Sequence, residues 1–283
     1  MNATSLPHLK IAFVATRDLS QLNGRTPIQG HIIRSLRRHH RLEVLHLRSV
    51  MQTRQRRDVI GAAFTWIKSV LSGHPLPLQC LLYGAPSEAA RLTAEIRAGD
   101  FDAVYLDTVR CQILLRELRR ELPDLHVVAD FDDLMSRRAA FLARNNMPFL
   151  SGHVGPHFPR WLRWVIEVPL ARLITAYEAL TLPAAEREVV GNADMTVLLS
   201  GLEAKLLEQR TGASVRAILP GIYATDAQVA LLPEGAYTLE ESIATRIDEA
   251  VNTLLEGALA PRHAVAGSGS FAPIPFSQVR CSV

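Results

Sequence analysis

The chain has 283 residues, 48% of them hydrophobic, which is enough to bury a substantial core in one large or two small domains. Its formal net charge is only +3, and aromatic residues make up 6% of it. No helix-turn-helix, zinc-finger or RNA-binding aromatic motif accompanies the arginines, so the sequence argues against nucleic acid as a partner. The positive excess instead indicates a nearby phosphate or anionic surface.

Cysteine usage and the apolar runs indicate a cytoplasmic protein. Cys80, Cys111 and Cys281 lie far apart and form no CxxC pair or other metal-ligand spacing, so we expect reduced, packed thiols and no metal site. Residues 1–10 contain no signal-peptide core, and no apolar run reaches the roughly 18 residues that a spanning helix needs. We therefore expect a chain that is neither exported nor integral to a membrane.

The first elements form a strand–helix–strand unit. Residues 10–16 have the continuous apolar character of a strand buried on both faces of a parallel sheet. A helix is predicted from Thr26, which we interpret as its N-cap, with Pro27 at the first helical position and Gln29 closing a capping box. Residues 42–47 then alternate toward a second strand, and the connection between the two strands should be right-handed.

Residues 54–72 are predicted to form a helix that carries both apolar and cationic side chains. Two interpretations follow: the helix rests against a bilayer surface, or it is an ordinary surface helix packed on the sheet. We favour the second, because the amphipathic pattern is modest and a glycine interrupts it. The first interpretation would make the protein peripheral at the inner face of the membrane.

Strands and helices continue to alternate as far as residue 222. This alternation predicts an α/β protein with a Rossmann-like parallel sheet and helices on both faces. A long loop is predicted over 145–159, and a long helix over 161–182 that Pro183 kinks or restarts. The other predicted elements are helices over 87–98, 111–122 and 239–255 and strands over 101–107, 125–130, 193–200 and 217–222.

Three aspartates, Asp130, Asp132 and Asp133, lie where a predicted buried strand ends. The carboxyl ends of parallel strands border the ligand crevice of an open sheet, so we expect the cluster to lie there. Crowded carboxylates raise the pKa of at least one member, which suits a base that takes a proton from a hydroxyl. Asp132 and Asp133 are therefore the candidate catalytic residues. The structural alternative is that one of them caps the following helix.

Gly24 and Arg25 precede the helix that begins at Thr26. Free amides and the helix dipole favour an anion at such a position, and Arg25 adds a formal charge, so this loop is a candidate phosphate site. A well-capped helix with an exposed arginine explains the same residues equally well. Neither GxGxxG nor GxxxxGK[ST] occurs in the chain, which disfavours a nicotinamide-dependent oxidoreductase.

Ser200 and Glu203 have the spacing of a capping box at the start of a helix. We favour this structural role over a catalytic one. A serine with no histidine and acid in evident relation does not form a nucleophilic triad.

Several of these segments follow one another in an order and spacing that chance does not readily reproduce. They begin with the first strand and the loop behind it, and they end at Ile222. The segments are the Gly24 loop, Asp132-Asp133-Leu134-Met135-Ser136-Arg137, Tyr177-Glu178 on the long helix, Ala193-Asp194 with Leu199-Ser200 and Glu203, and Leu219-Pro220-Gly221-Ile222.

Together they resemble the N-terminal, acceptor-side half of GT-B glycosyltransferases, of the family 4-like type that belongs to bacterial exopolysaccharide pathways. The resemblance implies a first Rossmann-like domain that binds a glycan or lipid-linked acceptor and a second that binds the nucleotide sugar, with no metal or other cofactor. It implies that the Gly24 loop approaches the donor phosphates or the transferred sugar and that Asp132 and Asp133 face the acceptor. The further substrate-binding residues implied are Arg25, Ser136, Arg137, Tyr177, Glu178, Ser200 and Glu203.

The resemblance ends at residue 222. About 60 residues remain, fewer than such a domain usually needs. We therefore expect residues 1–222 to form one GT-B half and residues 223–283 a helical, partly disordered tail without a complete donor-binding domain. The expected function is hexose transfer from a nucleotide sugar, with a separate donor-binding subunit as partner. The alternative is a non-catalytic glycan- or partner-binding protein that keeps the fold.

Overall fold

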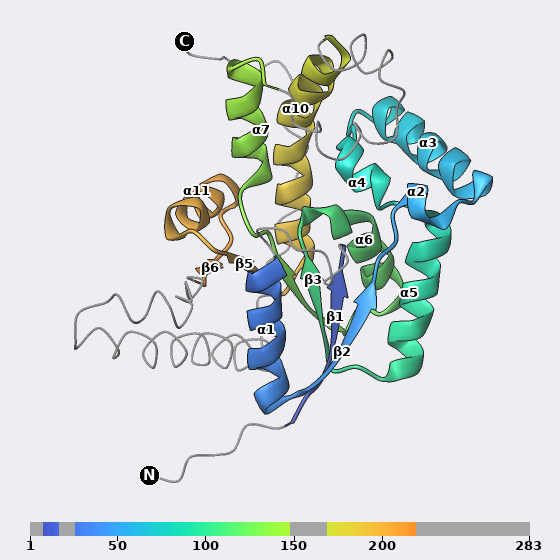
Figure 1. The fold of residues 1–283 in the computed structure, drawn as a ribbon, viewed down its shortest axis with the longest axis vertical. Coiled ribbons are helices and arrows are strands. Elements are labelled where there is room, and N and C mark those ends of the chain that lie inside the picture. Colours follow the sequence, from blue (N-terminus) through green and yellow to red (C-terminus); the bar gives the residue numbers. More distant parts are fainter. Residues whose placement is uncertain (1–7, 17–25, 148–168, 219–283) are drawn as a thin grey trace, which may run out of the picture.

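The structure is a computed structural model, and it describes residues 8–16, 26–147 and 169–218. The described residues form an α/β domain built on a six-stranded sheet in which every neighbouring pair of strands is parallel (Figure 1). The predicted fold class is confirmed. The strands are β1 (Lys10–Ala15), β2 (Arg41–His46), β3 (Ala103–Asp107), β4 (His126–Asp130), β5 (Met195–Leu198) and β6 (Val215–Ala217).

Helices connect the strands and cover the sheet. The segment between β2 and β3 is the most elaborate connection, because it contains four helices in the described residues. The helices are α1 (Thr26–His39), α2 (Val50–Thr53), α3 (Arg56–Leu71), α4 (Leu78–Leu82), α5 (Pro86–Gly99), the 3-10 turn η1 (Val109–Cys111), α6 (Gln112–Glu121), α7 (Met135–Arg144), α10 (Pro169–Asn192) and α11 (Gly201–Thr211).

The strand order is β2-β1-β3-β4-β5-β6, so the direction of winding reverses between β1 and β3. From β1 the chain moves outward to β2, then returns to β3 on the other side of β1 and continues toward β6. The order β2-β1-β3-β4-β5 within this sheet is the strand order of the flavodoxin-like doubly wound sheets. In such sheets ligands bind beyond the carboxyl ends of the strands at the reversal, which here lies between β1 and β3.

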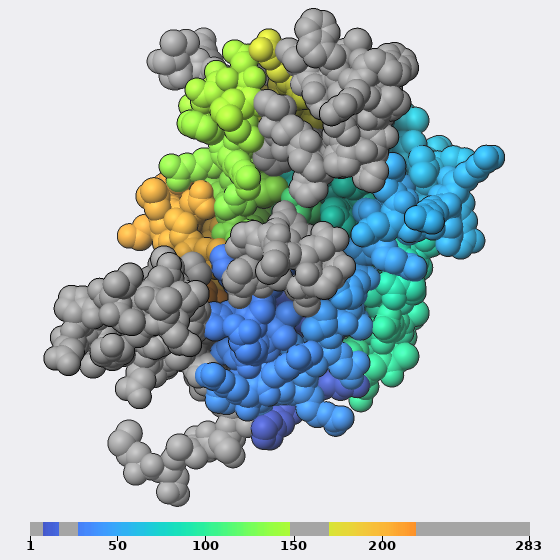
Figure 2. All heavy atoms as spheres, viewed as in Figure 1, coloured from blue at the N-terminus to red at the C-terminus, as the bar shows by residue number. Residues whose placement is uncertain are grey.

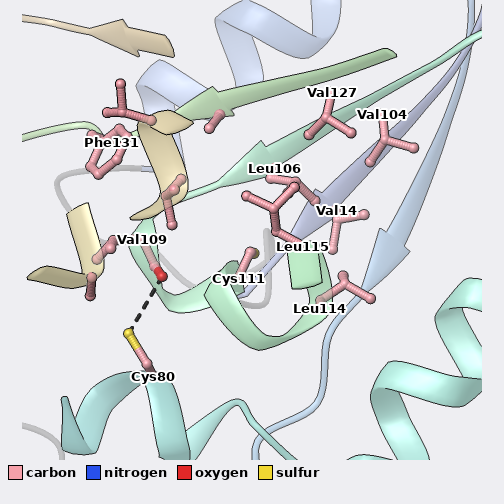
Figure 3. Close-up of a cluster of buried hydrophobic side chains, with 14 of the residues drawn as sticks. Val14, Cys80, Val104, Leu106, Val109, Cys111, Leu114, Leu115, Val127 and Phe131 are labelled. Atoms are coloured by element: carbon pink, nitrogen blue, oxygen red, sulfur yellow. Dashed lines mark hydrogen bonds between the residues drawn. The ribbon is translucent and has the colours of Figure 1, made fainter. Parts of the chain in front are cut away.

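The core consists of two apolar layers, one on each face of the sheet. The smaller layer packs Phe13 and Tyr105 against α1, and the two rings stack with centroids 5.1 Å apart. The larger layer lies under α5, α6, α10 and α11, and Figure 3 shows its centre. It includes Val14, Val104, Leu106 and Val127 from the strands and Leu114 and Leu115 from α6.

Two cysteines belong to the larger layer, as the sequence predicts for packed thiols. Cys80 and Cys111 are free and buried, and Cys80 Sγ donates to Val109 O over 3.5 Å (Figure 3). Burial raises the pKa of both thiols, which keeps them protonated and unreactive at neutral pH. Cys281 lies outside the described residues.

Two predicted boundaries are wrong. Helix α10 runs through Pro183 and ends at Asn192, although a proline in a helix interior costs about 3 kcal/mol. Leu182 and Val189, on either side of that proline, are both buried in the larger core layer, and this packing outweighs the missing hydrogen bond. The last strand occupies Val215–Ala217, earlier than predicted, and residues 219–222 and the predicted helix over 239–255 lie outside the described residues.

The helix predicted over 54–72 is confirmed as α3. It packs mainly on α2, α4 and α5 and not on the sheet, so the interpretation we favoured from the sequence is wrong in its packing partner. No helix in the described ranges is both long and apolar enough to cross a bilayer.

Candidate ligand-binding edge of the sheet

A buried polar group lies at the carboxyl ends of β1 and β3, where the winding reverses. Asp107 ends β3 and has no exposed surface. Its Oδ2 accepts hydrogen bonds from Gln29 Nε2 at 2.7 Å and from Thr16 Oγ1 at 3.3 Å. Thr16 directly follows β1, and Gln29 lies in the first turn of α1. Three elements therefore meet at one carboxylate.

Gln29 is fully buried, and its side-chain oxygen Oε1 has no hydrogen-bond partner among the residues that the structure describes. The Gln29 half of the predicted capping box is therefore wrong, because Oε1 is the atom that would accept from the Thr26 amide. Gln29 instead turns its amide group toward the sheet edge and Asp107. A buried amide oxygen without a donor costs about 1–3 kcal/mol, so this atom needs a physical explanation.

A second buried carboxylate, Asp130, lies at the same edge. It ends β4 and is paired in register with Asp107 on the neighbouring strand. Its Oδ2 accepts from Tyr105 Oη at 2.8 Å, and its Oδ1 accepts from the backbone amide of Asp132 at 2.9 Å. Two carboxylates on adjacent central strands thus lie together at the edge where a doubly wound sheet binds its ligand.

The backbone just beyond these two strands is strained. Thr108 has φ 75° and Asp132 has φ 64°, a region that residues other than glycine rarely adopt. The Thr108 amide donates to Asp130 O at 2.7 Å, which holds the strained residue in place. Such conformations cost about 1–3 kcal/mol each and cluster at functional sites. Their position supports this edge as the candidate site.

Asp132 and Asp133, the predicted catalytic residues, follow β4 and are both half-buried. Asp133 forms an ion pair with Arg138 at 3.2 Å. Neither aspartate caps the following helix, because the N-cap of α7 is Leu134 and no side chain caps it there. The capping alternative is therefore wrong. A role as base stays a prediction.

The first amides of α7 are bound by carboxylates from other helices. Glu203 of α11 accepts from the Leu134 amide at 3.1 Å, and Glu186 of α10 accepts from the Ser136 amide at 2.7 Å. Arg210 of α11 forms an ion pair with Glu186 and donates to Ser136 Oγ at 3.0 Å. These contacts satisfy the helix terminus without a local cap because α7, α10 and α11 converge beside it.

Half of the capping box predicted at Ser200 and Glu203 is confirmed. The Ser200 side chain accepts from the Glu203 amide at 3.4 Å, so Ser200 caps α11. The Glu203 carboxylate, however, reaches Leu134, and it also lies 3.8 Å from Arg137. Ser136, Arg137 and Glu203 are thus brought together behind the Asp132 turn, while binding of a substrate by them stays a prediction.

Tyr177 and Glu178 lie on the other side of the sheet from α1, where they attach the α3–α4 segment to α10. Tyr177 Oη accepts from Trp66 Nε1 at 2.8 Å and donates to the backbone oxygen of Leu76 at 2.9 Å. The fully buried carboxylate of Glu178 accepts from Gln79 N at 3.1 Å and from Gln79 Nε2 at 2.8 Å. Burial raises the pKa of Glu178, although hydrogen bonds from Gln79 oppose the rise.

The sequence did not identify Thr16, Gln29 and Asp107 as candidate site residues. Thr16 and Asp107 do end two predicted strands, but only the order of the strands shows that these two ends are adjacent. Gly24 and Arg25, which precede α1, lie outside the described residues. Within the described ranges, no group of three or more His, Cys, Asp or Glu residues is arranged to hold a metal ion.

The fold and this edge define a doubly wound α/β protein with a buried polar group at its winding reversal. In a comparison with known proteins, neither a protein-family model nor a curated protein matches the chain.

Proposed function

We propose that the chain is the acceptor-binding half of a sugar transferase and that a saccharide binds at the carboxyl edge of β1, β3 and β4. The observation that carries the proposal is the buried Gln29 Oε1 beside Asp107, at the winding reversal. A saccharide hydroxyl is a donor that suits this acceptor. A site built to bind a hydroxyl also rejects analogues that lack it, because its buried polar atoms would stay unpaired.

The proposed reaction follows from the resemblance of the sequence to GT-B acceptor domains. A hexose passes from a nucleotide sugar to an acceptor hydroxyl on a glycan or lipid-linked glycan, and a nucleoside diphosphate leaves. The proton of that hydroxyl goes to a carboxylate of the Asp132 turn, since Asp132 and Asp133 adjoin the edge and are only half-buried.

A second candidate, a non-catalytic glycan-binding protein, is supported by the hydrogen bonds of the two buried carboxylates. Within the described residues, Asp107 accepts hydrogen bonds from Thr16 and Gln29, and Asp130 accepts them from Tyr105 and the Asp132 amide. Carboxylates held in this way orient a ligand without having to exchange a proton.

Thermal unfolding of the full chain with added ligands tests both candidates. The ligand series contains UDP-glucose, UDP-N-acetylglucosamine and GDP-mannose as donors, and glucose, mannose and their disaccharides as acceptors. A ligand at tenfold its dissociation constant stabilises the protein by about 1.4 kcal/mol, which raises Tm by about 3–5 °C. Stabilisation by a saccharide supports the acceptor site, and stabilisation by saccharides but by no donor favours the non-catalytic candidate.

Gln29→Leu should abolish the saccharide-dependent rise in Tm, measured against the unliganded variant. Gln112→Leu is the matched control, because Gln112 is also buried with an unpaired Oε1 but begins α6, under the opposite face of the sheet. A saccharide response that survives Gln29→Leu, or is lost equally in the control, would contradict the proposed site.

A further inference from the structure

Helix α3 has the reverse of the usual distribution of side chains on a surface helix. Its buried residues are Asp58, Ala62 and Ser69, which are small or polar. Its large apolar residues face solvent, with Phe64 exposed by 69% and Leu71 by 83%. A helix that only covers a protein core turns its large apolar residues inward. The helix therefore meets the body of this protein with its polar face.

The exposed residues form one continuous apolar face. Ile60, Phe64, Ile67 and Leu71 follow one another at spacings of four, three and four, so they lie on a single stripe of the helix. In Figure 1, α3 lies at the periphery of the molecule, away from the sheet, and its atoms form an outer edge of the space-filling view in Figure 2. Val59 and Val70 flank this stripe and are also exposed, and Trp66 beside them is 38% exposed although its Nε1 donates to Tyr177 Oη on α10.

Cations accompany this face. Arg54, Arg56, Arg57 and Lys68 are all exposed, and the only carboxylate between residues 54 and 74 is the buried Asp58. The surface that α3 presents is therefore both apolar and positively charged. This combination is typical of helices that lie in the plane of a membrane interface, with the apolar side chains below the headgroups and the cations beside lipid phosphates.

We propose that α3 is a membrane-docking helix whose partner is an anionic lipid bilayer. The charges decide between this partner and a second copy of the chain. A two-fold contact through the same face would bring the four cations of each copy together, and like charges oppose such a contact. An anionic bilayer instead attracts each of these cations. The bilayer also matches a convex helical face, which offers no groove to a peptide.

Flotation of the full chain with lipid vesicles tests the proposal. Vesicles of phosphatidylcholine with 30% phosphatidylglycerol should carry the protein, and vesicles of phosphatidylcholine alone should carry at least about tenfold less, since several cations contribute. Phe64→Ser with Leu71→Ser should weaken binding to the anionic vesicles at least about tenfold, because each side chain buries apolar area in the bilayer. Arg57→Gln with Lys68→Gln should weaken binding to the anionic vesicles only.

Phe141→Ser is the matched control, because Phe141 is a large apolar residue of comparable exposure (62%) on α7. It should bind vesicles like the unchanged protein. No flotation with anionic vesicles, or equal flotation of the Phe64→Ser, Leu71→Ser variant, would overturn the proposal. A dimer in sedimentation velocity that this double variant abolishes would overturn it in favour of a second copy of the chain.

Discussion

The polar edge of the sheet and the outer face of α3 both reverse the usual distribution of side chains, and they do so with opposite consequences. At the edge, Asp107 and Asp130 are buried, but hydrogen bonds from within the chain compensate them. On α3, Phe64 and Leu71 are exposed, and nothing in the described part of the chain covers them. The fold itself compensates the buried carboxylates, whereas the exposed apolar side chains of α3 point to a partner outside the chain.

The largest expected effect comes from breaking a buried ion pair among α7, α10 and α11. Arg210→Met should reduce the free energy of unfolding by about 3 kcal/mol at pH 8, because it leaves the fully buried Glu186 without its cation. Burial raises the pKa of Glu186 even beside Arg210, so an unpaired Glu186 takes up a proton at higher pH still. The loss should therefore shrink as the pH falls from 8 to 5.

Urea unfolding at the two pH values measures this effect. Arg187→Met is the control, because Arg187 is the exposed neighbour of Glu186, and it should change stability by less than about 0.5 kcal/mol. An equal loss at both pH values would show that the charge of Glu186 is not the cause.

The next largest loss of stability is expected at the winding reversal, where Gln29 donates to Asp107. Asp107→Ala should cost about 2–3 kcal/mol, because Gln29 Nε2 loses its acceptor inside the protein. Combined with Gln29→Leu, the total loss should be smaller than the sum of the two single losses by about 1–2 kcal/mol. Strictly additive losses in chemical denaturation would indicate that the two side chains do not stabilise each other. Asp124→Ala, at an exposed site, is the control.

Glu88 provides an acid-sensitive contact at the start of α5, where it is almost fully buried between Arg48 and Arg91. Burial alone would raise the pKa of Glu88, but hydrogen bonds and charges from the two arginines outweigh it and hold the pKa at about 2. The contribution to stability is therefore present above the unfolded-state pKa of about 4.3 and is lost as the pH falls toward 2.

Glu88→Gln should cost about 2 kcal/mol at pH 7, a value reduced from full linkage because both arginines are partly exposed to water. The difference between the variant and the unchanged protein should shrink steadily below pH 4. Thermal unfolding from pH 7 to pH 2.5 measures it, and a difference that stays constant over this range would contradict the assigned pKa.

The smallest change in stability is expected on the exposed apolar face of α3. Phe64→Ser with Leu71→Ser should change the free energy of unfolding by less than about 0.5 kcal/mol in the absence of lipid, because both side chains are already exposed. Leu92→Ala, in the buried face of α5, removes a fully buried side chain and should cost about 3 kcal/mol. A large loss in the α3 variant would mean that this face is needed for folding.

Much of the architecture was predictable from the order of residues alone. The continuous apolar run at 10–16 predicts a strand buried on both faces, and 101–107 and 125–130 are predicted as two further strands; the structure has β1, β3 and β4 there. These patterns are local, so they can be read without knowledge of the fold. The helix over 54–72 could also be predicted from the local pattern of its side chains.

The candidate site and the role of α3 depended on tertiary structure. Gln29 and Asp107 are 78 residues apart, and only the strand order places β1 beside β3 and so brings them into contact. Likewise, Glu203 serves α7 instead of completing its own capping box, because α11 packs near that helix terminus. Local patterns record which residues are apolar. The orientation of α3, which exposes Phe64, is instead set by its tertiary packing on α2, α4 and α5 and by the hydrogen bond from Trp66 to Tyr177 on α10.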